Sequence, residues 1–246
     1  MAWRLGVDIG GTFTDVAVVD ETDGTIGVTK VSTTPGDFAR GVIEALEQAI
    51  SRYGIQPDAV NLLAHATTVV TNAILESKGA KIASISTRGF RDLLELRRSA
   101  RSDLYDLNQD PPSVLVPRRR RLEITERIGA DGSVVTPLDE REIDGLVAAL
   151  REQKVEAVAV SLLFSFLNDD HERRLGERLR TALPDIPIFL SSEVLPEIRE
   201  FERSSTTAVC AYVAPILESY LARLKQAVTA QGLPVPYVMG SGGGVF

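Results

Sequence analysis

The sequence predicts an α/β fold in which a mixed sheet carries flanking helices. Between residues 6 and 31, three short apolar runs alternate with tight turns, which is typical of an antiparallel meander. A helical repeat of apolar residues follows over residues 38–50. Residues 157–164 are almost wholly apolar, as in a strand that is buried on both faces. A sheet that opens with a meander and then crosses over by a helix is the expected beginning of a ribonuclease-H-like half.

The length and composition indicate a globular protein with room for one large domain or two modest ones. Of its 246 residues, 44% are hydrophobic and 25% are charged. The net charge of −7 argues against a general binder of nucleic acid or of anionic membranes. The single cysteine, Cys210, excludes an internal disulfide framework and any multi-cysteine metal site, and it fits a reducing compartment. The N-terminus lacks the pattern of a signal peptide and no apolar run reaches about 18 residues, so we expect a cytoplasmic protein.

The first turn of the meander joins two apolar runs through Gly10 and Gly11, which predicts a tight hairpin. Glycine has no Cβ, so its backbone can adopt positive φ and a ligand can come close to its N–H group. The hydroxyl groups of Thr12 and Thr14 add donors for phosphate oxygens. The turn is therefore a candidate phosphate cradle. In the alternative interpretation it is an ordinary hairpin whose threonine and aspartate side chains satisfy the turn amides.

Two carboxylates, Asp8 and Asp15, frame this turn. Magnesium bound to phosphate typically takes one or two protein carboxylates together with water. The string from Asp8 to Asp15, Asp-Ile-Gly-Gly-Thr-Phe-Thr-Asp, resembles the first phosphate loop of the actin, hexokinase and heat-shock ATPase superfamily. The resemblance implies that ATP and Mg²⁺ bind at this turn.

The second informative stretch, residues 62–76, reads as a short apolar strand that runs into a helix. His65, Thr67 and Thr68 fall at the junction, where free backbone N–H groups can bind anions or carbonyl oxygens. In the alternative interpretation the threonines cap the helix and the histidine bonds to nearby backbone. The residue types alone favour this alternative.

The rest of the chain continues the α/β pattern. Residues 81–85 predict a strand, and the arginines of residues 97–101 behind it can either hold a carboxylate or form a solvated face. The basic run 118–121 predicts an exposed strand start, followed by a hairpin over residues 122–135. The remaining elements that we expect are helices over residues 139–153 and 169–182 and strands over residues 157–164, 187–190 and 236–239.

The third informative stretch, residues 197–207, leads into a long helix that Pro215 is expected to kink. Arg203 lies among serine and threonine hydroxyl groups and can grip an anion there. It can equally pair with Glu200 or Glu202 while a serine caps the helix.

Together these motifs resemble the hydantoinase/oxoprolinase family, and they run along the whole chain in the order found in that family. They comprise the phosphate-loop string, residues 65–73, 76–81, 87–92 and 105–107, His171-Glu172 and residues 200–207. The sequence departs from the family pattern at Ala66, where glycine is usual, and at Gly242, where asparagine is usual. The resemblance implies an actin-like ATPase fold of the ribonuclease-H type. It also implies an ATP-dependent enzyme that opens cyclic amides such as hydantoins or 5-oxoproline, or that supports ketone carboxylation.

The family resemblance further implies roles for individual residues. The shared step is phosphoryl transfer from ATP to a carbonyl, amide or enol oxygen or to bicarbonate, and positioning carries most of its catalysis. The implied catalytic positions are Asp8, His65, Thr67 and Thr68. The implied ATP-binding positions are Gly10, Gly11, Thr12, Thr14 and Asp15, with Asp8 and Asp15 toward the metal. The implied substrate-binding positions are Asn72, Arg91 and Arg203.

The same resemblance predicts the domain organisation. Residues 1–190 are expected to form the first lobe, and residues 191–246 to begin a second, truncated hydantoinase A domain, so the isolated chain should show little turnover. The expected partners are the remainder of a longer chain and a hydantoinase B-type subunit, with no nucleic acid and no membrane. Two alternatives stay open: a nucleotide-responsive scaffold or partner subunit without catalysis, and a sugar kinase of the same superfamily.

Overall fold

The computed structural model describes residues 2–34, 37–99, 105–106, 108, 113–240, 242 and 244. Arg101, one of the arginines considered as a carboxylate contact, Leu107 of the 105–107 motif, and Ser241 and Gly243 near the C-terminus lie outside these residues. The chain divides into two compact units, which we call the first unit (Met1–Lys78 and Ile216–Phe246) and the second unit (Gly79–Pro215). Across the described part of the chain, no helix is both long and apolar enough to cross a membrane.

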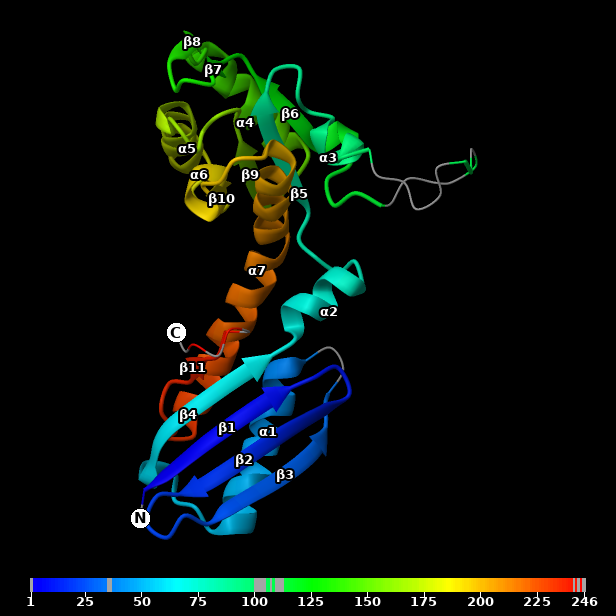
Figure 1. Ribbon diagram of the computed structural model, residues 1–246. Coiled ribbons are helices and arrows are strands. Elements are labelled where there is room, and N and C mark those ends of the chain that lie inside the picture. Colours follow the sequence, from blue (N-terminus) through cyan, green and yellow to red (C-terminus); the bar gives the residue numbers. More distant parts are fainter. Residues whose placement is uncertain are drawn as a thin grey trace. The chain divides into compact units, whose positions relative to one another are not determined.

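The first unit contains a five-stranded sheet in the order β11-β4-β1-β2-β3. Its strands are β1 (Trp3–Ile9), β2 (Phe13–Asp20), β3 (Ile26–Ser32), β4 (Val60–Thr67) and β11 (Tyr237–Val238). The first three strands pair antiparallel, whereas β4 and β11 run parallel to β1 (Figure 1). This arrangement confirms the predicted meander and crossover, and the strand order is that of a ribonuclease-H-like sheet.

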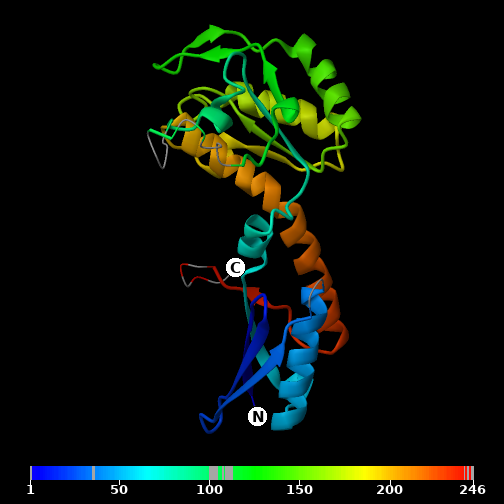
Figure 2. The same ribbon diagram turned by 90° about the vertical axis from the view of Figure 1, so that its right-hand side faces the viewer.

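Helix α1 (Phe38–Tyr53) and the last turns of α7 (Glu200–Ala230) cover the same face of this sheet (Figure 2). Alternate residues of the strands pack against them in one apolar core, which includes Leu5, Val7, Ile9, Val16, Val18, Leu46, Leu63, Tyr220 and Leu224. The side chains between them point to the opposite face, where Ile26 is 71% exposed. The sheet therefore has one covered face and one open face, which is the pattern of a half-buried antiparallel meander.

The second unit contains a four-stranded parallel sheet in the order β10-β9-β5-β6. Its strands are β5 (Ile82–Thr87), β6 (Arg121–Ile124), β9 (Ala157–Ser161) and β10 (Ile188–Leu190). Helices α4 (Ile143–Glu152) and α5 (Asp170–Ala182) pack on it through a second apolar core. Four of the five residues of β9 are buried, which confirms the predicted central strand.

Short elements complete both units. The first unit adds η1 (Pro57–Ala59) and α2 (Val69–Leu75). The second unit adds α3 (Leu93–Leu96), η2 (Arg118–Arg120), η3 (Glu140–Glu142), α6 (Ser191–Val194) and the hairpin of β7 (Arg127–Ile128) with β8 (Val134–Thr136).

Two expectations from the sequence differ from this architecture. We expected a boundary near residue 190, but the chain returns to the first unit from Ile216, and β11 pairs with β4 at Tyr237 and Val238. Residues 79–215 are thus an insertion into the first unit, and the C-terminal strand completes its sheet. We also expected an exposed basic run at residues 118–121, but the side chain of Arg121 is almost wholly buried.

Candidate functional site

The candidate site lies where two parallel strands of the first unit end. Ile9 at the end of β1 is opposite Thr67 at the end of β4, so both strands deliver their following residues to one edge of the sheet. Ligands of open α/β sheets commonly bind at this carboxyl edge. The edge therefore brings together the β1–β2 turn and the start of α2, which are two of the motifs that the sequence analysis singled out.

Three hydrogen bonds hold the β1–β2 turn in place. Gly10 N donates to Phe13 O at 2.9 Å, and Thr33 donates from N to Thr12 O and from Oγ1 to Gly10 O, both at 2.9 Å. The bonds from Thr33 come from the end of β3 and fix two carbonyl groups of the turn. The turn is thus ordered by its own unit, which lowers the entropy cost of binding a ligand there.

The two glycines of the turn leave space for their neighbours rather than supply an unusual backbone conformation. Neither Gly10 nor Gly11 has a positive φ, in contrast to the freedom that the sequence suggested. A Cβ atom on Gly11 would lie 3.3 Å from Nδ2 of Asn72, and one on Gly10 would lie 3.3 Å from the carbonyl oxygen of Phe13. The missing side chain of Gly11 therefore lets Asn72 of α2 approach the turn.

Asp8 and Asp15 face each other directly across β1 and β2, on the open face of the sheet. Like charges directly opposite each other in a sheet destabilise it, by up to about 1 kcal/mol. Lys30 on β3 offsets part of this repulsion, since its Nζ lies 3.0 Å from Oδ1 of Asp15. A hollow of about 240 Å³ adjoins both carboxylates, and small residues such as Ala17, Ala64 and Ala66 keep it open.

This carboxylate pair fits magnesium only in company with phosphate. Among the described residues, no group of three or more histidine, cysteine, aspartate or glutamate side chains is placed to hold a metal ion. Magnesium usually keeps several waters and takes one or two carboxylates plus substrate phosphates. Asp8 and Asp15 therefore match the protein's share of a phosphate-bound ion and do not form a complete site by themselves.

Thr68 and Asn72 join the turn at the same edge of the sheet. Thr68 donates from both N and Oγ1 to Ile9 O at 3.3 Å, and Nδ2 of Asn72 lies 3.5 Å from Oγ1 of Thr68. Thr68 is exposed and Asn72 is half-buried, so both side chains can contact a ligand beside Gly11. Gly11 and Asn72 also line a pocket of about 310 Å³ in the first unit.

Comparison with known proteins identifies the family. Residues 4–183 match the hydantoinase/oxoprolinase N-terminal region. The chain belongs to this family. The resemblance inferred from the sequence motifs is thereby confirmed.

Relatives within the hydantoinase/oxoprolinase family include proteins of known structure. The caprolactamase subunit alpha of Pseudomonas jessenii is 38% identical over 98% of this chain and 36% of its own length. The crystal structure of the ATP-dependent caprolactamase from that organism superposes with a TM-score of 0.88, at 37% identity over 98% of this chain and 36% of the other. The nucleotide-free structure of acetone carboxylase gives a TM-score of 0.87, at 28% identity over 100% of this chain and 37% of the other. The chain thus spans little more than a third of the length of these relatives.

One threonine of the family's phosphate-loop motif points away from the candidate site. Thr14 is fully buried, and its Oγ1 lies 3.1 Å from Oγ1 of Thr33 on the covered side of the sheet. This position argues against the phosphate contact that we expected from its hydroxyl group. The alternation of Thr14, Val16 and Val18 already carried this information, because residues two apart on a strand share a face.

His65 is also turned into the core of the first unit. The side chain is fully buried, and its Nε2 lies 2.8 Å from the hydroxyl group of Tyr220 on α7. Burial lowers the pKa of His65 to about 4. Burial likewise raises the pKa of Tyr220. His65 is therefore neutral near pH 7, and its place argues against the expected direct contact with a substrate.

Thr67 serves the helix that follows it. Its Oγ1 accepts a hydrogen bond from Val69 N at 3.1 Å, at the start of α2. Thr68 is the N-cap residue of α2, but its side chain makes no capping hydrogen bond, so the capping alternative holds only for this contact of Thr67. Of the predicted site residues in the stretch 62–76, Thr68 and Asn72 are thus the two whose side chains can contact a ligand.

Arg203, which the family motif suggested as a substrate contact, lies deep in the second unit. Its guanidinium group donates to Ser191 Oγ at 3.1 Å, Glu197 O at 3.0 Å and Leu162 O at 2.8 Å. Burial lowers the pKa of Arg203, and the carboxylates of Glu172 and Glu200 oppose this shift. The partners expected from the sequence, Glu200 and Glu202, make no hydrogen bond to it among the described contacts. The role in substrate binding stays a prediction, and these contacts favour a structural role.

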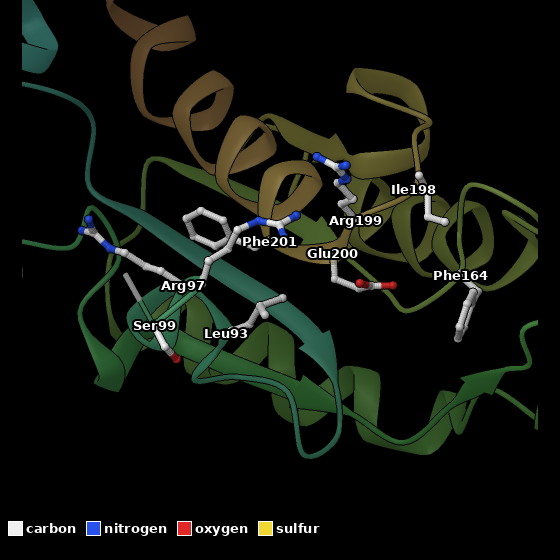
Figure 3. Close-up of a pocket in the computed structure, with 9 residues that line it drawn as sticks. Leu93, Arg97, Ser99, Phe164, Ile198, Arg199, Glu200 and Phe201 are labelled. Carbon is white, nitrogen blue, oxygen red and sulfur yellow. The ribbon is translucent and has the colours of Figure 1, made fainter. Parts of the chain in front are cut away.

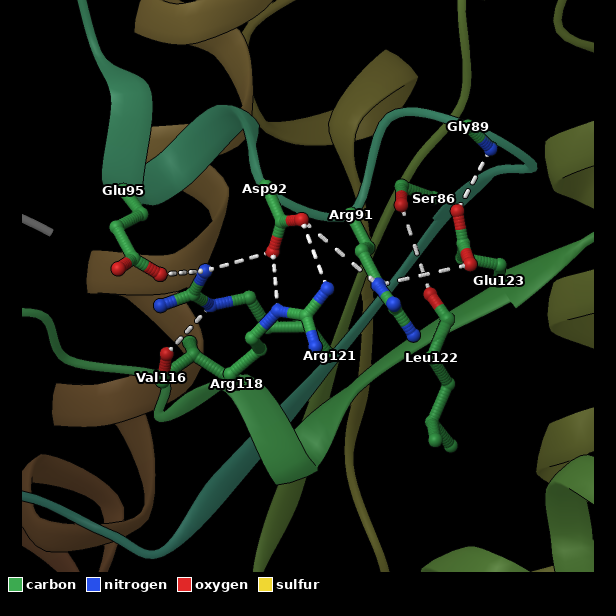
Figure 4. A network of polar contacts seen from close by, with 10 residues as sticks. All are labelled: Ser86, Gly89, Arg91, Asp92, Glu95, Val116, Arg118, Arg121, Leu122 and Glu123. Atoms are coloured by element: carbon green, nitrogen blue, oxygen red, sulfur yellow. Dashed lines mark hydrogen bonds and ion pairs between the residues drawn. The ribbon is translucent and has the colours of Figure 1, made fainter.

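Arg91 belongs to a polar network of the second unit (Figure 4). Its Nε lies 3.9 Å from Asp92 Oδ2 and 3.8 Å from Glu123 Oε2. The hydrogen bond from Arg118 is the main cause of the lowered pKa of Asp92, and the buried Arg121 bonds to the same carboxylate at 3.3 Å. Arg91 is partly exposed, so its contact with a substrate also stays a prediction.

A shallow hollow of about 640 Å³ in the second unit is lined by several arginines but does not focus them on one point. Figure 3 shows the guanidinium groups of Arg97 and Arg199 pointing in different directions. Arg98 lines the same hollow and makes a two-pronged contact with Glu202, at 2.5 and 2.8 Å. The hollow therefore lacks the convergent donors of an anion site.

Sequence reasoning missed three residues that border the candidate site. Tyr220, Arg223 and Lys78 line the same pocket as Gly11 and Asn72. Tyr220 and Arg223 lie three residues apart on a long helix that looked wholly structural in the sequence. These residues lie beside the β1–β2 turn because the chain returns to the first unit at Ile216, and the sequence alone does not reveal this return.

Proposed function

We propose that this chain holds the phosphate tail of ATP at the β1–β2 turn, within an enzyme that transfers a phosphoryl group to a carbonyl or amide oxygen. The observation that carries the proposal is the pair Asp8 and Asp15, which face each other beside a turn that is already ordered. Such a pair lowers the stability of the sheet, and a bound cation explains why it is there. The names of the caprolactamase and acetone carboxylase structures, both described as ATP-dependent, support the same assignment.

In this proposal, the residues at the carboxyl edge of the first sheet have different roles. The turn of Gly10, Gly11 and Thr12 surrounds the phosphates, and Asp8 and Asp15 are the residues that would hold Mg²⁺. The metal supplies neutralisation of phosphate charge, which is the main demand of phosphoryl transfer. Thr68 and Asn72 position the acceptor oxygen. Phosphorylation of an amide oxygen makes its carbon more open to attack by water, so the first proposed reaction is the opening of a cyclic amide. The second proposed reaction is the activation of a ketone for carboxylation.

The proposal includes partners outside this chain. The matched relatives are nearly three times as long, and several are named as subunits. We therefore propose that further polypeptide, in the same chain or in a hydantoinase B-type partner subunit, completes the active site. The cytoplasm is the proposed location.

The variant Asp8→Asn tests the nucleotide assignment. Titration calorimetry with Mg²⁺ and a non-hydrolysable ATP analogue should show binding weakened at least about tenfold, because one anionic ligand of the metal is lost. The unfolding free energy should not fall, because the repulsion with Asp15 is relieved. The matched control is Asp23→Asn, which removes an exposed carboxylate from the turn after β2 and should leave affinity unchanged. Unchanged affinity in both Asp8→Asn and Asp15→Asn would refute the assignment.

A further inference from the structure

The shallow hollow of about 640 Å³ in the second unit is built from the connections that leave the carboxyl ends of its parallel strands (Figure 3). Leu93 follows β5, Phe164 follows β9, and Ile198 follows β10. The chain leaves β5 toward β6 and leaves β9 toward β10, and these two strands are the opposite edges of the sheet. Where neighbouring parallel strands diverge in this way, a crevice opens outside their carboxyl ends, and open α/β sheets bind ligands there.

Four residues that line this hollow have an unfavourable backbone conformation. Positive φ values of 54°, 53°, 55° and 88° are found for Arg97, Ser99, Phe164 and Arg199. These are four of the six non-glycine residues with positive φ in the described part of the chain. A residue with a Cβ is disfavoured in this region, and such residues cluster at functional sites, where the surrounding structure holds them. Their concentration around one hollow indicates that its shape serves a contact with another molecule.

The hollow and its margin also present apolar side chains to solvent. Ile198 is 68% exposed, and Leu96, at the end of the same short helix α3 as Leu93, is 65% exposed. Phe164 and Phe201 line the hollow and are half-buried. Exposed apolar residues that gather in one place mark a contact surface, whereas scattered ones need no explanation. This surface is therefore suited to large apolar side chains of a second molecule.

The charges around the hollow favour an acidic occupant. Three arginines and one glutamate line it, in a chain whose net charge is −7. Arg98 pairs with Glu202, and Arg97 donates to Ser113 O at 3.0 Å. The exposed guanidinium group of Arg199 makes no hydrogen bond or ion pair with any residue that the structure describes. Because the arginines point in different directions, they suit carboxylates spread along a polypeptide better than one small anion.

We propose that this hollow is the docking surface for an acidic segment of a partner polypeptide. The segment inserts large apolar side chains between Leu93, Phe164 and Ile198, and its carboxylates pair with the surrounding arginines. Protein interfaces combine an apolar core with a polar rim and are enriched in aromatic residues and arginine, which is the composition found here. The surrounding fold already holds Phe164 and Arg199 in their strained conformations, so less ordering is needed when the partner binds. The proposal does not depend on the nucleotide site of the first unit.

Fluorescence anisotropy with three labelled synthetic peptides tests the docking surface. The peptides have equal length and alternate charged pairs with uncharged pairs: the first contains glutamate and phenylalanine, the second lysine and phenylalanine, and the third glutamate and alanine. The first should bind at least about tenfold more tightly than the others, since it alone carries both kinds of side chain that the hollow matches. Added salt should weaken it. Equal binding of the three peptides, or no detectable binding of the first, would overturn the proposal.

Two pairs of variants locate the bound peptide. Arg199→Glu should weaken binding of the first peptide at least about tenfold, whereas Arg119→Glu, at an exposed arginine outside the hollow, should leave it unchanged. Ile198→Ser should likewise weaken binding, and its control is Val135→Ser, at a residue of β8 that is 63% exposed. All four residues are exposed, so the variants should keep the Tm of the unmodified protein. A variant and its control that act equally would refute the location.

The competing occupant is a second copy of this chain. Sedimentation velocity of the full chain without peptide separates the two cases. We expect the same sedimentation coefficient for the unmodified protein and for Ile198→Ser and Arg199→Glu. Self-association that either variant abolishes would show that another copy covers the hollow, and it would overturn the proposal of an acidic partner.

Discussion

In the first unit, Asp8 and Asp15 reach the open face of a sheet, whereas in the second unit Glu172 and Arg203 are completely buried. All four belong to motifs that the sequence offered as functional. Asp8 and Asp15 repel each other, and the partly exposed Lys30 pairs with Asp15. The second pair is linked through Ser191, and both members are surrounded by hydrogen-bond partners. A family motif thus identifies residues that the fold needs, and burial decides which of them can meet a ligand.

The buried charged residues of the second unit have several hydrogen-bond partners each. Glu172 accepts from Leu162 N at 2.7 Å, Ser191 Oγ at 2.6 Å and Ser192 N at 2.9 Å. A second buried pair includes His171, the neighbour of Glu172 in the sequence, whose Nδ1 lies 2.8 Å from Oε2 of Glu126. Breaking a buried charge network by removing one member leaves the other charge without compensation, which is costly.

The largest loss of stability that follows from this comparison of the two units is expected for Arg203→Leu. The substitution removes the positive charge that compensates the buried carboxylate of Glu172 and leaves the carbonyl groups of Leu162 and Glu197 without their donor. It should lower the stability of the second unit by about 3–5 kcal/mol. Hydrogen exchange measured by mass spectrometry should become faster in peptides from β5 and β9, while those from β1 and β2 keep their protection. Arg98→Leu is the control: its side chain is 51% exposed in a surface pair with Glu202, so the loss should be at most about 1 kcal/mol. Equal losses of stability in the two variants would show that the buried contacts of Arg203 do not stabilise the second unit more than a surface ion pair does.

The sequence predicted the first unit well where the signals were local. Alternating apolar residues and glycine turns predicted β1, β2 and β3, and helical spacing predicted α1. The face of each polar residue could have been read from the same alternation, since Thr14 shares a face with Val16, and His65 with Leu63. The phosphate contact of Thr14 was expected from its hydroxyl group and the substrate contact of His65 from the family resemblance, and neither expectation took this alternation into account.

Long-range pairing was beyond sequence reasoning. Nothing local shows that Tyr237 and Val238 join β4, which lies more than 170 positions earlier in the chain. The boundary expected near residue 190 was displaced for this reason. The burial of Arg203 was equally hidden, because its partners Leu162 O and Ser191 Oγ come from separate elements of the second unit.

A smaller effect is expected from the neutral His65 in the first core. Its pKa of about 4 lies below the ordinary 6.5, so the folded state binds fewer protons than the unfolded state between these values. Its contribution is fully present above pH 6.5 and is lost as the pH falls toward 4, by up to about 3 kcal/mol. Chemical unfolding followed by the emission of Trp3, the single tryptophan, measures this unit. His65→Gln should flatten the pH dependence between 6.5 and 4, and an unchanged slope would contradict the assignment.

The contrast between the two faces of the first sheet predicts a third effect. A Cβ on Gly27 of β3 would lie 2.3 Å from the ring of Tyr53, whereas one on Gly6 of β1 would meet nothing within 4 Å. Gly27→Ala should therefore lower stability by about 1–3 kcal/mol through overpacking. Gly6→Ala should be neutral or slightly stabilising, because it removes chain entropy from the unfolded state. Urea unfolding of the two variants compares them directly, and a larger loss for Gly6→Ala would mean that the open face is covered.

The most direct test of the phosphate turn is hydrogen exchange with and without Mg²⁺ and a non-hydrolysable ATP analogue. We predict that the analogue with magnesium slows exchange in residues 9–14 and 67–72 of the first unit, and that Asp8→Asn combined with Asp15→Asn removes this protection. Protection that is absent from these residues, or that persists in the double variant, would contradict the account.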